Sequence, residues 1–306
     1  MSLEEFESQL GKDLWTLIEG LNSPLVEATA LTSLPSLWHV RASFRLQFAD
    51  RRILKGRRFQ TDDEAERVEY LSRFLDPRYF PKVLARCRRA LLIEWVEGEP
   101  LTPAQCQAEL LRRCGALQGM LHTKPLPDEA YTRYQPAAHD WQSRLERSIH
   151  DVVKYEAFTR EEGKRLFDLA LAYAPGADAM GIGHGDFCAE NMVFRAPGSF
   201  SVIDNEALSI DACDHDLART WYRWPMSPDQ REAYYDGYNQ YRSSADFIRD
   251  LLYWVIIVLV DSAAFRLRAG TRDALIPIRQ LRTLLGNDMQ SGIYLRSELL
   301  MKDKDT

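Results

Sequence analysis

The period of the apolar residues changes along the chain. Leucines recur at spacings of three and four through residues 3–21, and this period predicts a helix. From residue 43 to residue 48 apolar residues alternate with others, a turn follows at Ala49 and Asp50, and residues 52–55 resume the alternation. Alternation on both sides of a short turn predicts a β-hairpin.

A second helix signal begins at Thr61. Thr is a preferred N-cap residue, and Glu64 stands three positions later, as in a capping box. The helix places Glu64, Val68 and Leu71 on one face, at spacings i, i+4 and i+7. Residues 91–96 then form an apolar run that predicts a further strand.

The pattern becomes mostly helical after residues 97–100, where a glycine and a proline favour a hinge. A period near 3.6 predicts helices over residues 102–122, 140–158, 160–173, 214–223, 228–242 and 245–268. Thr102 and Pro103 suit the start of the first of these helices. Two strand-like pieces, 192–195 and 200–203, interrupt the helices and are joined by a turn.

This order of elements predicts an α+β fold in three parts. We expect a helical extension over residues 1–30, a small β-rich lobe over residues 31–97 and a mostly helical lobe over residues 98–306. The most apolar run, residues 251–260, is too short to cross about 30 Å of hydrocarbon, so we expect a buried core helix and no membrane span.

Composition agrees with an ordinary globular protein, since 45% of the 306 residues are hydrophobic and 27% are charged. The five cysteines form no CxxC pair and no metal-ligand spacing, and the chain begins with no signal-peptide pattern. Free thiols in a reducing compartment are therefore expected, which favours a cytoplasmic location.

Charge is distributed unevenly around a net value of −6. Residues 38–90 hold 14 Lys and Arg against 7 Asp and Glu, whereas residues 91–306 hold 24 against 32. A basic first lobe suits a polyphosphate and an acidic second lobe suits a cationic acceptor; two solvated surfaces of different composition are the alternative. The basic residues accompany no recognition motif, so we expect no nucleic-acid binding.

Two polar segments, residues 184–191 and 202–206, carry candidate chemistry. Phosphoryl transfer requires a carboxylate near the acceptor hydroxyl and oxygen ligands that hold Mg²⁺ against the nucleotide phosphates. Asp186 fits the first role. Asn191 and Asp204 fit the second, because they flank the two short predicted strands and a hairpin would bring them together.

The pattern HGDxxxxN, followed by a strand that ends in IDxE, resembles the aminoglycoside phosphotransferase and choline kinase-like family. The resemblance implies a two-lobed protein-kinase-like fold, with a small β-rich N-lobe and a mostly helical C-lobe. It also implies a kinase that uses ATP or GTP with Mg²⁺ to phosphorylate a hydroxyl group of a small molecule, such as an amine-bearing metabolite or an aminoglycoside-type antibiotic. Asp186 would be the base, His184 would orient its loop, and Asn191 and Asp204 would bind the metal.

The resemblance extends to further positions. Lys55 stands where the family keeps the lysine that binds the α- and β-phosphates, and Glu64 would be its acidic partner. Glu94 to Val96 would contact the adenine through backbone groups. Asp216 matches a buried aspartate that braces the catalytic loop.

Two features depart from related kinases. Residues 31–45 contain no glycine, so the expected glycine-rich phosphate loop is missing. Residues in this segment that could still bind phosphate are Ser33, Ser36 and the backbone around Leu37 and Trp38. A catalytically inactive kinase-like binding module is therefore the alternative function.

The second departure concerns the acceptor. Only 12 positions separate Asp204 from Asp216, which leaves no room for the activation segment of a protein kinase. We therefore expect a small acceptor rather than a peptide. Neither the identity of the acceptor nor an oligomeric state follows from the sequence.

Some assignments stay open. Glu206 either lies beside the metal ligands or faces the acceptor, and His122 is interpreted as a packing or C-capping residue. Aromatic residues after the second motif could receive a cation or belong to the core, with the core favoured by their helical spacing. These are Trp221, Tyr222, Trp224, Tyr234 and Tyr235.

Overall fold

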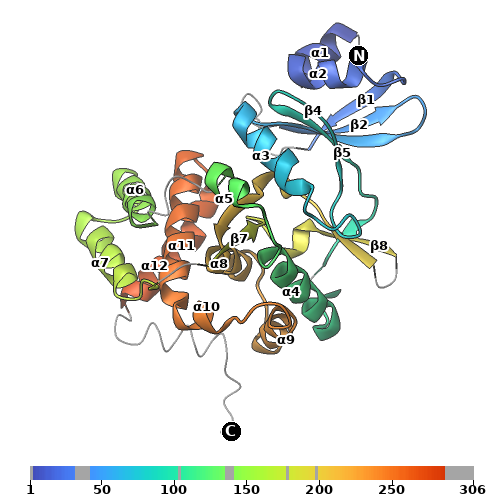
Figure 1. Ribbon diagram of the computed structural model, residues 1–306. Coiled ribbons are helices and arrows are strands. Elements are labelled where there is room, and N and C mark those ends of the chain that lie inside the picture. The colour runs from blue at the N-terminus through green and yellow to red at the C-terminus, as the bar shows by residue number, and fades with distance from the viewer. Residues whose placement is uncertain are drawn as a thin grey trace. The chain divides into compact units, whose positions relative to one another are not determined.

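A computed structural model describes residues 3–31, 42–102, 105–134, 141–176, 179–196 and 199–286 (Figure 1). The chain divides into two compact units. The first comprises Met1–Leu101 with Ala189–Ser209, and the second comprises Thr102–Cys188 with Ile210–Thr306. The second polar segment, residues 202–206, therefore belongs to the unit that contains the β-rich lobe, although the chain reaches it only after several helices of the second unit.

Two short helices open the first unit, α1 (Leu3–Leu10) and α2 (Lys12–Glu19). The sequence predicts a single helix here, and the break falls at Gly11, which has φ 77°. This left-handed conformation suits glycine and interrupts the helical ladder. The apolar faces of both helices nevertheless lie on the same side, as the leucine spacing predicts.

Five antiparallel strands form the main sheet in the order β1-β2-β3-β5-β4. Their bounds are β1 Leu25–Ala30, β2 Ala42–Phe48, β3 Ile53–Arg58, β4 Val83–Cys87 and β5 Ala90–Glu94. The predicted hairpin is confirmed as β2 and β3, joined by a turn at residues 49–52. The two outer strands, β1 and β4, carry weak patterns that the sequence analysis missed.

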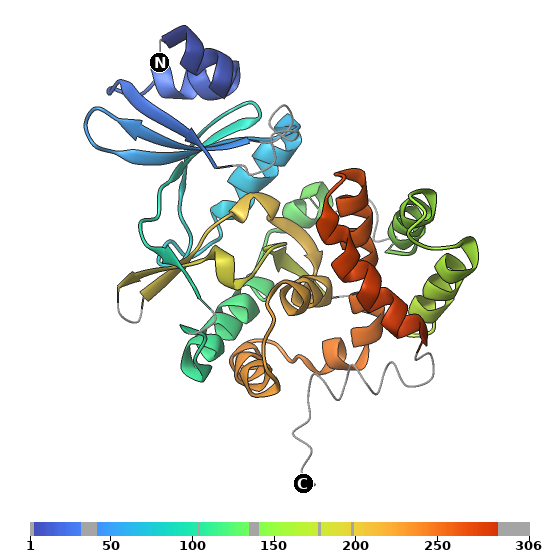
Figure 2. The same ribbon diagram turned by 180° about the vertical axis from the view of Figure 1, so that it is seen from behind.

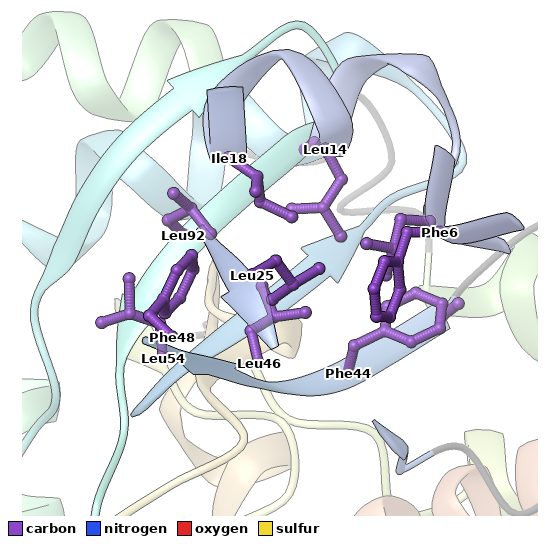
Figure 3. Close-up of a cluster of buried hydrophobic side chains, with 12 residues drawn as sticks. Phe6, Leu14, Ile18, Leu25, Phe44, Leu46, Phe48, Leu54 and Leu92 are labelled. Atoms are coloured by element: carbon purple, nitrogen blue, oxygen red, sulfur yellow. The ribbon is translucent and has the colours of Figure 1, made fainter. Parts of the chain in front are cut away.

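One face of this sheet is covered by α1 and α2 (Figure 2). Aliphatic and aromatic side chains from the helices interdigitate with those of β1, β2, β3 and β5 (Figure 3). The cluster contains Phe6, Leu14, Ile18, Leu25, Phe44, Leu46, Phe48, Leu54 and Leu92. Burial of this apolar surface fixes the sheet, and with it the strand that carries Lys55.

Helix α3 (Asp62–Ser72) begins at the predicted N-cap. The Thr61 hydroxyl accepts a hydrogen bond from the Glu64 N–H at 3.2 Å. The Glu64 carboxylate accepts from the Gln60 N–H at 3.0 Å. The buried face is formed by Ala65, Val68 and Leu71, and Glu64 is half-buried at its edge.

The predicted second hairpin is confirmed by β8 (Met192–Ala196) and β9 (Ser199–Val202). It forms a three-stranded sheet with β6 (Glu99–Pro100), in the order β6-β8-β9. Two residues of its predicted turn, 197 and 198, lie outside the described residues. The pairing with β6 places the hairpin in the first unit.

The second unit is built mainly from helices, together with the two-stranded pair β7 (Met180–Gly183) and β10 (Ser209–Ala212). The helices are α4 Ala108–His122, α5 Asp128–Tyr134, α6 Trp141–Lys154, α7 Arg160–Leu171, α8 Cys213–Arg223, α9 Pro228–Tyr238, α10 Ala245–Arg249, α11 Leu251–Arg268 and α12 Leu275–Gly286. The sequence analysis missed α5, α12 and the pair β7–β10.

Several predicted helix bounds are corrected. Helix α4 starts at Ala108 with Gln107 at its N-cap, not at residue 102, because the Thr102 N–H and hydroxyl instead bond the Gln105 side chain in a separate turn. Pro103 lies outside the described residues. The predicted helix 245–268 is divided at Asp250, which serves as the N-cap position of α11.

Helix α11 is the core of the second unit, where it packs against α6, α8 and α12 (Figure 1). Every residue from Leu251 to Val260 is buried, which confirms the predicted core helix. Among the described helices, none combines the length and apolar character that a membrane span requires. The five cysteines are free thiols, as expected.

Helices α4 and α9 pack backbone against backbone. A Cβ added at Gly115 would lie 1.9 Å from the Tyr234 carbonyl oxygen, and one added at Gly237 would lie 1.8 Å from the Arg112 carbonyl oxygen. Only glycine permits this approach. It brings polar side chains of α4 beside tyrosines of α9, under the loop that carries Asp186.

Candidate active site

Lys55, on β3, forms ion pairs with two carboxylates that follow the β8–β9 hairpin. Its Nζ contacts Oδ1 of Asp204 and, at 2.5 Å, Oε1 of Glu206. Glu206 lies in the single turn η4 (Asn205–Ala207). The side chains of Lys55 and Glu206 are 11% and 10% exposed, whereas half of the Asp204 side chain is exposed.

The two buried members of this cluster hold each other in the charged form. Burial lowers the pKa of Lys55, but the charges of Glu206 and Asp204 outweigh burial and raise this pKa above its ordinary value. Burial raises the pKa of Glu206, but the charges of Lys55 and Arg57 bring it down to about 2. Lys55 and Glu206 are therefore both ionised at neutral pH.

The hairpin register brings Asn191 and Asp204 to one end of β8 and β9. Met192 pairs with Val202, and the Ile203 N–H donates to the Asn191 carbonyl oxygen at 2.8 Å. The backbones of the two predicted metal ligands therefore leave the hairpin side by side. Their role as ligands stays a prediction.

The chemistry of these residues fits a magnesium ion. Mg²⁺ commonly takes one or two protein oxygen ligands and completes its shell with phosphate oxygens and water. Asp204 provides a half-exposed carboxylate and has a left-handed backbone, with φ 61° and ψ 44°, of the kind that recurs at functional sites. In the described part of the chain, no group of three or more His, Cys, Asp or Glu could form an all-protein metal site.

The loop that carries Asp186 follows β7 in the second unit and is braced by Asp216 of α8. One carboxylate oxygen of Asp216 accepts from the Gly185 N–H at 2.7 Å, and the other accepts from the His184 N–H at 3.2 Å. The Asp216 residue is 1% exposed. Two consecutive backbone groups of the loop are thus held by one carboxylate.

A buried polar network of α4 and α9 holds Asp216 in turn. Its Oδ2 receives hydrogen bonds from Gln118 at 2.9 Å and His122 at 3.0 Å, and His122 also contacts the Tyr238 hydroxyl at 2.8 Å. Burial raises the pKa of Asp216, but the bond and charge of His122 outweigh burial and hold this pKa well below its usual range. His122 is buried against the Tyr238 ring, as its interpretation as a packing residue predicts, and it is also a member of this network.

The Asp186 carboxylate contacts two arginines of α8. Arg223 Nε donates to Asp186 Oδ1 at 2.9 Å, and Arg219 Nη2 lies 3.9 Å from the same oxygen. The Asp186 N–H donates to Nδ1 of His184 at 3.3 Å. The sequence analysis missed both arginines, although their positions three and seven residues after Asp216 place them on neighbouring turns of one helix.

The predicted nucleotide-binding residues lie in the first unit. The partners that the structure gives Lys55 are Asp204 and Glu206, so the assignment of Glu64 as its acidic partner stays a prediction. Glu94 ends β5, where its N–H donates to the Lys82 carbonyl oxygen at 2.9 Å.

Val96 is buried two residues later, and the contact of these backbone groups with adenine stays a prediction. The phosphate-contacting residues expected within 32–41 lie outside the described residues. These are Ser33, Ser36, Leu37 and Trp38.

Most of the candidate cation-binding aromatics belong to the core. Trp224, Tyr234 and Tyr235 are buried and line a cavity of about 10 Å³, which holds no more than one water molecule. Trp221 and Tyr222 are half-buried, and arginine side chains already lie over both rings.

A model described as the phosphotransferase enzyme family matches residues 30–248. No curated protein shows significant similarity to the chain. Among solved structures, an ethanolamine kinase of Plasmodium vivax is 13% identical with a TM-score of 0.65, covering 95% of this chain and 94% of that one. A choline kinase of Cryptosporidium parvum is 14% identical with a TM-score of 0.58, covering 96% and 98%.

The gentamicin complex of the phosphotransferase APH(2″)-IIa is 17% identical with a TM-score of 0.66, covering 92% of this chain and 95% of that one. Identities at this level establish a shared fold. The family match covers more than half of the chain and includes both motifs. The chain therefore belongs to the phosphotransferase enzyme family, the aminoglycoside phosphotransferase and choline kinase-like group of small-molecule kinases that its two motifs resemble.

Proposed function

We propose that the protein transfers the γ-phosphate of ATP or GTP, bound with Mg²⁺, to a hydroxyl group of a small molecule. The observation that carries this proposal is the cluster of Lys55, Asp204 and Glu206 at the end of the hairpin that also positions Asn191. A buried cation beside the half-exposed Asp204 carboxylate suits a nucleoside triphosphate with its metal ion.

Asp186 acts on the acceptor in this proposal. Its carboxylate orients the hydroxyl group and takes its proton while the hydroxyl oxygen attacks the γ-phosphorus. A new O–P bond forms, the bond from the γ-phosphorus to the β–γ bridging oxygen breaks, and its electron pair leaves with the nucleoside diphosphate. Mg²⁺, when bound, neutralises charge on the phosphate oxygens.

Lys55 binds the α- and β-phosphates, and Glu206 is its positioning residue. The Glu206 carboxylate is buried and ionised, so it holds the ammonium group of Lys55 in place beside β3. Asp204 is the more exposed of the two carboxylates that contact Lys55. In this proposal Asp204 would be the one that holds the metal ion. The contact with Lys55 supports a role of Glu206 on the nucleotide side.

His184 and Asp216 support the reaction without touching the reacting atoms. Both hold the backbone around Asp186, through the Asp186 N–H and the Gly185 N–H respectively. The short Asp204–Asp216 segment supports a small acceptor, and the five free thiols support work in the cytoplasm.

The alternative function is a catalytically inactive module that binds a nucleotide or a small molecule. The glycine-free segment 31–45 favours it, because a glycine-free backbone approaches phosphates less closely. The ionised Lys55 cluster favours the kinase instead.

Two measurements on the full chain separate these functions. ATP with Mg²⁺ is expected to raise the melting temperature, and ADP is expected to appear when a library of hydroxyl-bearing metabolites and antibiotics is added. A melting temperature raised by nucleotide without ADP release from any library member would support the inactive module. No response to nucleotide and no ADP release would contradict the kinase and favour an inactive module that binds a small molecule.

A further inference from the structure

Helix α8 presents two arginines to the residue that acts as base in the proposed function. Arg219 and Arg223 are four residues apart and therefore project from the same face of the helix. Arg223 bonds Asp186 at 2.9 Å, and Arg219 lies 3.9 Å from the same carboxylate oxygen. Two guanidinium groups on one face of α8 thus lie beside the Asp186 carboxylate.

The backbone of the loop that carries Asp186 has hydrogen bonds of its own. Asp216 already holds two N–H groups of the loop, and Arg219 Nε donates to the Gly185 carbonyl oxygen. Arg219 Nη2 lies at an ion-pair distance from Asp186, not at a hydrogen-bond distance. Arg219 and Arg223 each keep 33% of the side chain exposed, so an incoming anion can reach them.

Two acidic residues on and before α8 have partners of their own. Asp214 pairs with Arg242 at 3.6 Å, and Asp211 contacts His215 at 3.1 Å.

Aromatic rings near the end of α8 are also unsuited to a cationic acceptor. The Arg231 guanidinium lies 5.0 Å from the ring centre of Trp221, and the Arg266 guanidinium lies 5.7 Å from that of Tyr222. A ring face that already carries a cation repels a second one.

We propose that Arg219 and Arg223 bind an anionic group of the acceptor, a carboxylate or a phosphate, next to the hydroxyl group that receives the phosphoryl group. The inference rests on the proposed function and names its substrate class. The planar guanidinium fork matches both anions. Binding of the anion reduces the repulsion between the two like charges and holds the hydroxyl group near Asp186.

The test compares acids with their uncharged analogues. Calorimetric titrations of the full chain, with and without a non-hydrolysable ATP analogue and Mg²⁺, use gluconate against gluconamide, glycerate against glyceramide, and glycerol 3-phosphate against glycerol. Choline serves as the cationic probe. We expect at least one acid to bind about tenfold or more tightly than its uncharged partner, and the partner pairs distinguish a carboxylate from a phosphate preference.

Arg219→Gln is the informative variant, because Arg219 touches Asp186 only at ion-pair distance. It is expected to remove the preference for the acid, and Arg219→Lys is expected to restore part of it. Arg223→Gln is expected to act in the same direction. Arg147→Gln, which changes an exposed arginine of α6, is the matched control and is expected to leave binding unchanged.

Turnover gives a second readout. In Arg219→Gln, KM for the acidic acceptor is expected to rise about tenfold, equivalent to about 1.4 kcal/mol, while KM for ATP is unchanged. A rise confined to KM for ATP would mean that the arginine serves the transferred phosphate, and would overturn the inference.

Different results would contradict the transfer reaction and the anion subsite. Acid binding that Arg219→Gln abolishes, without ADP release from any acceptor, would support the anion subsite and contradict the transfer reaction. Equal binding of every acid and its uncharged partner, or tighter binding of choline, would overturn the anion subsite whether or not ADP is released.

Discussion

The Asp186 carboxylate is the residue on which the proposed transfer depends. Asp186→Asn keeps the size of the side chain and the hydrogen bond of its backbone N–H with His184, but removes the proton acceptor. We expect kcat to fall by about 10² to 10⁴-fold. Nucleotide affinity is expected to be unchanged, because Lys55 and Asp204 are untouched.

Steady-state kinetics with an acceptor found by screening, together with calorimetric titration of the ATP analogue, checks this prediction. Arg147→Gln provides the control for a change of charge elsewhere in the second unit. A normal kcat in Asp186→Asn would mean that another group takes the proton.

The lowered pKa of Glu206 predicts that the free energy of unfolding depends on pH. Its pKa falls from 4.5 to about 2 on folding, so its contribution is fully present above pH 4.5 and is lost as the pH falls towards 2. A shift of this size corresponds to at most about 3 kcal/mol. Asp216, whose pKa is also lowered, acts in the same direction.

Urea unfolding at several pH values between 2 and 7 measures this effect. Glu206→Gln is expected to lower stability at pH 7 and to flatten the loss between pH 4.5 and pH 2, since the side chain no longer titrates. Asp168→Asn, which removes an exposed carboxylate of α7, is the control and should keep the wild-type slope. An unchanged slope in Glu206→Gln would show that the ion pair with Lys55 does not perturb this carboxyl group.

At the scale of elements, the contact of α4 with α9 supports the catalytic loop. Gly115→Ala places a methyl group 1.9 Å from a carbonyl oxygen of α9, and the two helices must separate. We expect a loss of about 1–3 kcal/mol of unfolding free energy. Gln118 and His122 then move away from Asp216, so kcat is expected to fall as well.

Thermal unfolding and kinetics of the same variant test this link. Gly176→Ala is the matched control, because a Cβ at Gly176 meets no atom within 4 Å. Loss of stability with an unchanged kcat would show that the loop keeps its geometry without the α4–α9 contact.

At the scale of the whole molecule, the residues named in the proposed reaction are divided between the two units. The first unit carries Lys55, Asn191 and Asp204, and the second carries Asp186 with the arginines of α8. Asp204→Ala is expected to weaken binding of the Mg²⁺–nucleotide complex, whereas Asp186→Asn is not. Ligand at 100 times its Kd stabilises a protein by about 2.7 kcal/mol, so most of this thermal stabilisation should disappear in Asp204→Ala.

Thermal unfolding with ATP and increasing Mg²⁺ measures the difference between the two variants. An equal response of wild type and Asp204→Ala to Mg²⁺ would assign the metal to other residues. Unfolding without ligand serves as the control for damage to the fold.

Local rules made much of the fold predictable. The alternation in β2 and β3, the Thr61 cap and the hairpin that joins the two motifs each depend on residues close in sequence. The missed elements have weaker local signals: β1 and β4 lie at the edges of the sheet, and the break at Gly11 requires a backbone angle that a leucine spacing does not encode.

The sequence by itself determined the family, the hairpin and the residues that flank it. The spacing of polar residues around two short strands can be read directly from the order of residues in the chain. Only the tertiary structure decided the partners of each charge. Glu206 reaches Lys55 across 151 positions, and Arg223 reaches Asp186 across 37, so no local pattern predicts either pair. Which carboxylate a buried ammonium contacts depends on how strands and helices pack, and therefore on the whole core.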